Sequence, residues 1–406
     1  MFLRKRKYDS TGSLSKLAWI RFRRNSVSFS SLVFIGLVAL LSIIGYWVTP
    51  DKTPMVNEQN LLLATLKPGS EVTVLKVYKN QDIPYRNILR VLLYGQENKY
   101  QNFPLSSYWF ASDSIVITEY SKDSSGREIG FHLANVCYPL YENASITKNG
   151  KQISFITLDG KLVKTSVEEL RQQITKENIV QKTFILGTDR YGRDVLSQLV
   201  IGTRVSLSVG FISVAISLLI GISLGAIAGY FGGKIDALIS WFINVVWAVP
   251  TLLLVIAITF ALGKGFWQVF VAVGLTMWVE VARVVRGQFM SLREKEFVEA
   301  ARALGYRNFR IIFKHILPNA MAPVIVISAA NFASAILLEA GLSFLGIGVQ
   351  PPMPSWGGMI KENYAYIILD YAYLAILPGL AIMVMVLAFM LIGNGLRDAL
   401  DVRTAD

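Results

Sequence analysis

The chain has 406 residues, a hydrophobic content of 53% and a formal net charge of +12 at neutral pH. This composition excludes an ordinary soluble protein and predicts several membrane crossings, with room for one soluble domain. Two histidines and one cysteine exclude a disulfide framework within the chain, and their scatter predicts no metal site. The basic residues gather beside apolar segments, so we interpret them as an orientation signal and expect no nucleic-acid partner.

Six apolar segments are the candidate transmembrane helices. The first follows a basic amphipathic elbow at residues 1–25, which we expect on the cytoplasmic leaflet, and it is too long for a cleaved signal sequence. The expected spans are 26–50, 205–233, 237–263, 266–282, 318–340 and 371–396. The predicted fold class is therefore an all-α polytopic membrane protein of six transmembrane helices.

The distribution of basic residues predicts which loops stay in the cytoplasm. Residues 1–25 carry eight Lys/Arg and one acid, and the loop 283–315 carries eight Lys/Arg and three acids. Short loops rich in Lys and Arg remain cytoplasmic, so we expect this loop and both termini there. The segment 51–204 has nineteen basic and sixteen acidic residues, and a segment this long is translocated largely regardless of charge.

Residues 51–185 have the composition of a small soluble domain outside the cytoplasm. Val72–Val77 alternates like a strand, and the pairs Asn149-Gly150 and Asp159-Gly160 separate short strand-like runs. A capping box at Ser166 predicts a helix start. We expect an inserted small α+β domain that contains the chain's one cysteine and no catalytic set of residues.

The loop 283–318 carries two short amphipathic patterns separated by a glycine. Gly305 can end the first helix, and Asn308 can cap the second. On spacing alone, such a helix pair fits a groove of another protein or the lipid surface equally well. The helical spacing places apolar residues on one face of each helix: Phe297, Ala300, Ala301 and Leu304, then Phe309, Ile312, Phe313 and Ile316.

The order of residues in this loop resembles the EAA loop of ABC importer permeases, with Glu299-Ala300-Ala301, then Gly305, then Ile316-Leu317-Pro318. Other stretches resemble the C-type permease subunit of dipeptide and oligopeptide importers. The resemblance covers 1–50 and 185–402, while the inserted domain is far longer than the linker that most such subunits carry. The matching stretches are Trp19–Asn25, Gly187–Asp194, Gly229–Gly233, Leu342–Pro352, Pro354–Gly357 and Gly395–Asp401.

The resemblance implies a type I ABC importer permease subunit for short peptides, in the inner membrane of a bacterium, with residues 186–402 as a five-span core. It also implies a homologous second permease subunit, two ATP-binding subunits that hold ATP and Mg, and an extracytoplasmic binding protein. Nickel chelates, glutathione and antimicrobial peptides are alternative cargoes. The residues implied in coupling to the ATPase are Glu299, Ala300, Ala301, Leu304, Gly305, Phe309, Ile316 and Pro318.

The chain itself is expected to lack catalytic activity, because no Gly-Lys pair is followed by Ser or Thr and a phosphate-binding loop is therefore missing. A G-x-S-x-G pattern at Gly221–Gly225 lies within a span that has no histidine, so it does not indicate a hydrolase. Gly221, Gly225 and Gly229 are more typical of close helix packing.

Polar or helix-breaking residues inside the spans are candidates for the translocation pathway. Glu280 lies one turn from Arg283 and can form a local ion pair, and Glu339 is expected at the outer interface, where water solvates it. Pro250 is expected to kink or unwind its helix. The pathway candidates are Asn244, Pro250, Glu280, Asn331 and Glu339.

Two other classes of protein stay open. A secondary transporter would need coupling charges or broken helices in paired halves of the chain, which the sequence does not show. A membrane-anchored receptor would use 51–185 as a sensor but would not need five further spans.

Overall fold

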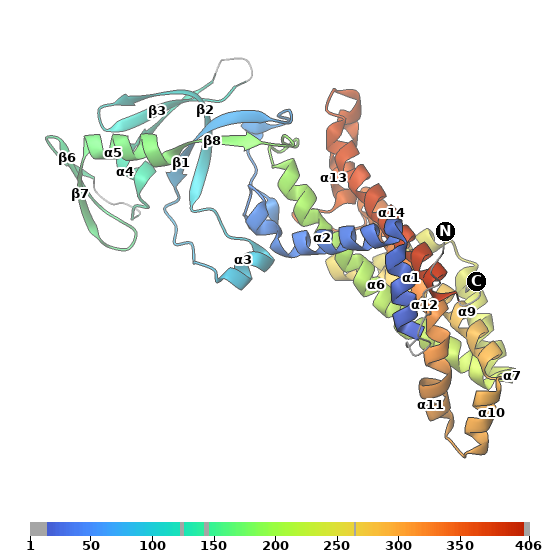
Figure 1. Ribbon diagram of the computed structural model, residues 1–406. Coiled ribbons are helices and arrows are strands. Elements are labelled where there is room, and N and C mark those ends of the chain that lie inside the picture. Colours follow the sequence, from blue (N-terminus) through green and yellow to red (C-terminus); the bar gives the residue numbers. More distant parts are fainter. Residues whose placement is uncertain (1–13, 122–125, 142–145, 264, 402–406) are drawn as a thin grey trace, which may run out of the picture. The chain divides into compact units, whose positions relative to one another are not determined.

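The computed structural model describes residues 14–121, 126–141, 146–263 and 265–401, and they form two compact units (Figure 1). We call residues 1–42, 202–364 and 375–406 the helical unit, and residues 43–201 and 365–374 the sheet unit.

The helical unit contains the apolar helices. Five described helices are long and apolar enough to cross a membrane, and a bent pair, α7 and α8, counts as a sixth span if taken together. The helices that belong wholly or partly to this unit are α1 Leu14–Arg24, α2 Ser26–Val48, α6 Val195–Phe231, α7 Gly233–Trp247, α8 Thr251–Leu262, α9 Phe266–Leu292, α10 Glu296–Ala303, α11 Asn308–Arg310, the π-helix η4 Ile311–Ile316, α12 Leu317–Phe344, α13 Trp356–Asn363 and α14 Tyr373–Leu400.

The expected span 237–263 is broken into two helices. α7 and α8 meet at an angle of 91°, and Pro250 precedes the first residue of α8. Proline lacks a backbone N–H and disfavours a helical residue before it, so the break expected there is confirmed. α6 has 37 residues and α9 has 27, against 29 and 17 in the expected spans 205–233 and 266–282. Their hydrogen-bonded turns continue past Arg204 and Arg283, because a single charge does not end a helix.

α6 packs closely on α9 through three glycines, as predicted from their spacing. A Cβ added at Gly225 would lie 2.5 Å from the Ala282 carbonyl oxygen, and one at Gly221 would lie 2.6 Å from Val281 Cβ. Gly229 meets the Arg286 carbonyl at 2.6 Å in the same way. Glycine is therefore what allows the two backbones to approach, as in other small-residue helix contacts.

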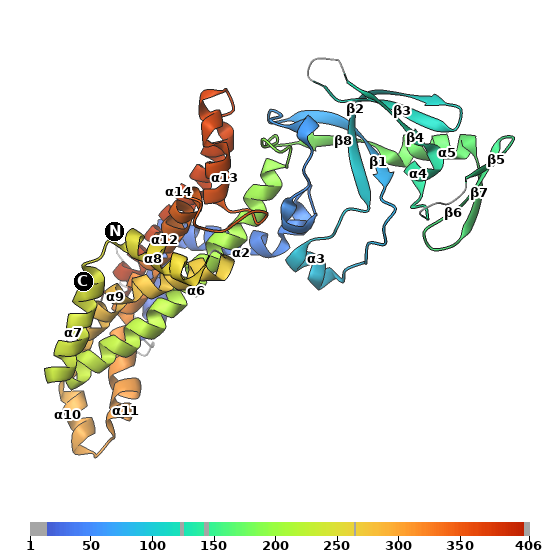
Figure 2. The ribbon, with the colours of Figure 1, turned by 180° about the vertical axis from the view of Figure 1, so that it is seen from behind.

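The sheet unit contains two antiparallel sheets (Figure 2). The larger has the strand order β4-β3-β2-β1-β8, and the smaller is the meander β5-β6-β7. The short helices that precede or link the strands are η1 Pro54–Val56, η2 Leu61–Leu63, α3 Ile88–Tyr94, α4 Leu133–Cys137, α5 Val167–Gln173 and the π-helix η3 Ile174–Asn178. The strands are β1 Ser70–Tyr78, β2 Tyr100–Ala111, β3 Ser114–Glu119, β4 Glu128–His132, β5 Thr147–Asn149, β6 Gln152–Ile156, β7 Leu162–Ser166 and β8 Ile179–Phe184.

β1 lies between β2 and β8 in the larger sheet, and apolar clusters cover both of its faces. Its residues alternate, so Val72 and Val74 pack into one apolar cluster and Leu75 and Val77 into another. The second cluster also holds Cys137, which is buried, and burial raises the pKa of its thiol to about 12. The strand, both hairpins and the Ser166 capping box predicted from the sequence are confirmed.

Candidate functional site

The loop between α9 and α12 ends its first helix at a glycine. Gly305 has a φ of +74°, and open space surrounds the position of a Cβ. The Gly305 N–H donates to the Arg302 carbonyl and the Tyr306 N–H to the Ala301 carbonyl, at 2.9 and 3.1 Å. These two bonds form a Schellman motif, which favours glycine at the left-handed position. The helix stop predicted at Gly305 is confirmed.

One face of the loop packs against the rest of the helical unit. Val298 and Ala301 of α10 and Ile311, Ile312 and Ile316 of the second half are buried in a cluster with α9 and α12. Each apolar face predicted from the sequence is therefore divided into a buried part and an exposed part. Ala301 and Ile316 belong to the buried part. This burial fixes the loop against the ends of α9 and α12.

The opposite face of the loop is apolar and exposed. Leu304 is 70% exposed and Phe309 72% exposed, and Phe297 and Phe313 are also exposed. The rings of Phe309 and Phe313 lie 4.4 Å apart. Glu299, Ala300 and Pro318 are exposed as well. A group of exposed large apolar side chains marks a surface that a partner protein or lipid can cover. We call Phe297, Leu304, Phe309 and Phe313 the apolar loop surface.

Asn308 does not cap the second helix, contrary to the prediction. The cap position is Arg307, which makes no side-chain capping bond. The Asn308 Oδ1 instead accepts a hydrogen bond of 2.9 Å from the Tyr230 hydroxyl at the end of α6. Arg293 donates to the Gly229 carbonyl at 3.2 Å nearby. The Gly229–Gly233 stretch therefore contacts the loop through its backbone and through Tyr230.

A cavity of about 320 Å³ lies beside the break between α7 and α8. Its polar lining includes Thr251 of α8, Thr276 and Glu280 of α9 and Ser334 of α12. Among the described residues, Glu280 makes no ion pair with Arg283, whose guanidinium lies over the Trp247 ring at 3.8 Å. The local pair considered for Glu280 is therefore absent there, and Glu280 lines the cavity.

The other pathway candidates are not among the residues that line this cavity. Asn244 is exposed on α7, and Pro250 is exposed at the break, between the lining residues Val249 and Thr251. Asn331 is 1% exposed, and its Nδ2 has no hydrogen-bond partner among the described residues. The break, the cavity and the buried amide all belong to the helical unit.

Glu339 is fully buried, so the expectation that water solvates it at the outer interface is wrong. The Ser343 hydroxyl donates to its Oε1 at 2.7 Å, and the Ser355 side chain is a second hydrogen-bond partner. α12 continues past Glu339 to Phe344, and the chain then folds back over it. A Cβ at Gly357 would lie 2.4 Å from the Ala340 carbonyl oxygen, so this return packs tightly on the helix.

In the sheet unit, the Gly187–Asp194 stretch forms a tight turn before α6. Asp189 accepts from the Arg193 side chain at 2.7 Å in a buried ion pair. Asp194 caps α6, because its Oδ2 accepts a hydrogen bond from the Ser197 N–H at 2.7 Å.

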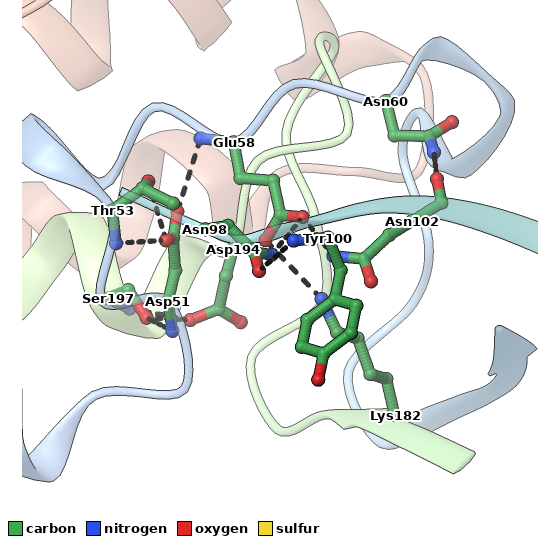
Figure 3. Close-up of polar contacts among 10 residues, drawn as sticks. All are labelled: Asp51, Thr53, Glu58, Asn60, Asn98, Tyr100, Asn102, Lys182, Asp194 and Ser197. Carbon is green, nitrogen blue, oxygen red and sulfur yellow. Dashed lines mark hydrogen bonds and ion pairs between the residues drawn. The ribbon is translucent and has the colours of Figure 1, made fainter. Parts of the chain in front are cut away.

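A polar cluster in the sheet unit was not identified from the sequence (Figure 3). Glu58 accepts from Asn98, Asn102 and Lys182, and Asp51 accepts from the Thr53 backbone and side chain. These side chains line a cavity of about 890 Å³. They come from distant segments, so no local spacing could have revealed them.

Burial raises the pKa of two carboxyls in this cluster. Desolvation is the main cause for both Asp51 and Asp194, and hydrogen bonds from Thr53 and Ser197 oppose it. The Asp51 N–H donates to the Ser197 hydroxyl at 3.1 Å, which joins the two acids. The bonds of this cluster tie the start of the inserted segment to the start of α6.

The described residues hold no group of three or more potential metal ligands.

Comparison with known proteins identifies the family. Residues 221–406 match the model of the binding-protein-dependent transport system inner membrane component, and residues 13–68 match the N-terminal TM domain of oligopeptide transport permease C. A dipeptide transport system permease protein of Alkalihalophilus pseudofirmus is 46% identical over 53% of this chain and 70% of its own. The chain belongs to this permease family.

Other relatives are also named as permease proteins of transport systems. An oligopeptide transport system permease protein of Bacillus subtilis is 39% identical over 53% of this chain and 70% of its own. A glutathione transport system permease protein of Pectobacterium atrosepticum is 42% identical over 53% and 71%. Among solved structures, an inward-facing MetNI methionine ABC transporter chain is 19% identical, with a TM-score of 0.43, over 50% of this chain and 96% of that one.

Membership makes the chain a C-type permease subunit of an ABC transporter, a multi-pass protein of the inner membrane. Hydrolysis of ATP in such systems belongs to separate ATPase subunits, so the permease is not itself an enzyme. Neither family model covers residues 69–220, which include most of the sheet unit.

Proposed function

We propose that this permease forms the translocation path of an ATP-driven type I importer of short peptides and is coupled to ATPase subunits through the loop 283–318. The apolar loop surface carries the proposal. Four large apolar side chains are exposed on a loop whose other face is buried against the span ends. A partner groove would remove this surface from water, and burial of apolar area favours such binding.

The rest of the coupling set has separate roles in this proposal. Glu299 and the nearby arginines set the register of the loop in the groove, Gly305 holds the turn, and Ala300 and Pro318 lie at its exposed edges. Ala301 and Ile316 transmit motion because they are buried against the spans. ATP and Mg are bound by the two partner subunits, whose approach and separation shift the spans between outward-facing and inward-facing states.

We infer the transported substrate from the names of the relatives. Those named above transport dipeptides, oligopeptides or glutathione by name, so short peptides are the proposed substrate class and glutathione the alternative. A homologous second permease subunit and an extracytoplasmic binding protein complete the proposed complex. Glu280 in the cavity beside the α7–α8 break is the favoured pathway residue, since Asn331 and Glu339 are buried among neighbouring residues.

The proposed domain organisation keeps residues 1–25 as the elbow, 186–402 as the core and 51–185 as an inserted domain outside the cytoplasm. Both termini are then cytoplasmic. The inserted domain has nearly balanced charge and serves as a contact surface for the binding protein or the partner permease.

Replacing Phe309 with Ser tests the coupling proposal. The variant should insert normally, yet lose co-purifying ATPase subunits and peptide uptake, because a central apolar contact is removed. Leu162→Ser is the matched control: Leu162 is 62% exposed on β7, outside the loop. Full ATPase recovery with Phe309→Ser, or equal loss with Leu162→Ser, would refute the assigned role of the loop.

A further inference from the structure

α3 of the sheet unit is a seven-residue helix with no buried residue. Large side chains on it and just before it are strongly exposed: Tyr85 is 81% exposed, Leu89 74%, Tyr94 64%, and Ile88 and Leu93 62% each. Such a concentration of exposed apolar surface is rare on a part of a protein that faces only water. Another apolar phase or a partner must therefore cover α3.

The end of α3 is fixed beside the end of the first span. Gly95 follows the helix with a φ of +72°, and a Cβ there would lie 2.7 Å from the Lys52 carbonyl oxygen and 3.0 Å from Tyr46 Cε1. The Gln96 N–H donates to the same Lys52 carbonyl at 2.8 Å. Tyr46 is in the last turn of α2, and Lys52 follows that helix by four residues. Figure 2 shows α3 beside this end of α2.

The start of α6, a second candidate span, lies beside the same end of α2. A Cβ at Gly45 of α2 would lie 2.7 Å from Ile201 Cδ1 of α6, so the last turn of α2 and the first turns of α6 are neighbours. Both contacts lie within the sheet unit. A helix of seven residues is only about 10 Å long, so all of α3 stays near the level at which these spans leave the hydrocarbon. The polar interfacial layer there is roughly 6 Å thick.

We propose that α3 lies in the interfacial layer of the bilayer leaflet that faces the sheet unit. Its leucines and isoleucine then contact acyl chains, and Tyr85 and Tyr94 lie among the head groups. Arg90 is exposed on α3, where anionic lipid head groups can reach it, whereas Arg86 forms an ion pair with Glu97 at 3.5 Å. Arg86 also donates to the Gly95 carbonyl at 3.0 Å and so holds the end of the helix in place. The inserted domain is thereby attached to the membrane at a third point, besides α2 and α6.

Spin-label accessibility tests this proposal on the full chain. The chain is reconstituted in vesicles of phosphatidylethanolamine and phosphatidylglycerol, with Cys137→Ser and a nitroxide on Leu93→Cys. Leu162→Cys is the matched control, because Leu162 is also 62% exposed and belongs to the same unit. Collisions with oxygen, which concentrates in lipid, are compared with collisions with a water-soluble nickel chelate. The ratio of oxygen to nickel collisions should be several-fold higher at Leu93 than at Leu162.

Two outcomes would overturn the proposal. Equal ratios at the two positions would place α3 in water, and protection of Leu93 from both reagents would mean that a protein covers it. A label on Leu89→Cys, where the side chain is 74% exposed, gives a second reading if a label at Leu93 disturbs its surroundings. The oxygen preference is expected there too, and a nickel preference at Leu89 would equally contradict the membrane location.

Discussion

The Tyr230 hydroxyl donates a hydrogen bond of 2.9 Å to Asn308 Oδ1 and so joins the end of α6 to the second half of the loop 283–318. These residues are 78 positions apart. Tyr230 also contacts the buried face of the loop through its ring, beside Val298 and Ile311. In the proposed mechanism, this contact lets a displacement of the loop reach α6 directly, in addition to α9 and α12.

Tyr230→Phe should weaken coupling without unfolding the permease. The change removes one hydroxyl, and a hydrogen bond contributes about 1 kcal/mol net, so transport per ATP hydrolysed should fall by up to about fivefold. The measurement is peptide uptake and ATP hydrolysis in the same proteoliposomes. Tyr85→Phe serves as the control, since Tyr85 lies in the sheet unit. An unchanged ratio of uptake to hydrolysis would show that the bond does not transmit motion.

Gly305→Val should uncouple transport more strongly than Gly305→Asn. A residue with a Cβ pays about 1–2 kcal/mol to hold the left-handed conformation, and Asn tolerates it better than a β-branched residue. Open space around Gly305 means that strain of the backbone, not a clash, causes the effect. Uptake in membranes with equal amounts of assembled complex gives the comparison. If Val and Asn behave alike, the left-handed turn is not what coupling requires.

The elements that were predictable from the sequence depend on local rules. The hairpins at Asn149 and Asp159, the Gly305 turn and the break at Pro250 each follow from what one or two residues do to the backbone. The close contact of α6 and α9 followed from the spacing of Gly221, Gly225 and Gly229.

The features that the sequence analysis did not predict depend on contacts between segments that are distant along the chain. Glu339 is buried because residues beyond α12 fold back over it, which no pattern around position 339 encodes. Tertiary packing likewise decides which residues of each apolar face of the loop 283–318 are buried and which are exposed. Helical periodicity identifies Ala301 and Leu304 as one apolar face, but only tertiary packing buries Ala301 and leaves Leu304 exposed.

Gly225→Ala should destabilise the permease, whereas Gly287→Ala should not. A Cβ at Gly225 would lie 2.5 Å from a carbonyl oxygen of α9, and overpacking of this kind costs about 1–3 kcal/mol. Gly287 is on α9 itself and has nothing within 4 Å of its Cβ position, so alanine there only improves helix propensity. Thermal denaturation of the purified chain in detergent distinguishes them. Equal midpoints for both variants would contradict the close α6–α9 contact.

Asp194→Asn should change how stability depends on pH. Burial raises the pKa of Asp194 above its ordinary value of 3.8, so the folded chain binds a proton more readily than the unfolded chain. For a carboxyl with a raised pKa, stability increases as the pH falls through the folded pKa toward 3.8 and is lowest at neutral pH. Relative to the Asn variant, the wild type should therefore gain stability on acidification. A difference in midpoint that is independent of pH would contradict the raised pKa.

Cysteine labelling tests the proposed orientation of the permease. In a Cys137→Ser background, a cysteine at Lys164 should react with a membrane-impermeant maleimide added outside intact cells, because this exposed residue belongs to the inserted domain. A cysteine at Asn308, exposed on the coupling loop, should react only after the membrane is opened. Replacing Cys137 guards against background, although its burial and its pKa of about 12 already make it a poor nucleophile. Labelling of Asn308→Cys in intact cells, with Lys164→Cys protected, would reverse the orientation and place the loop where no ATPase subunit could reach it.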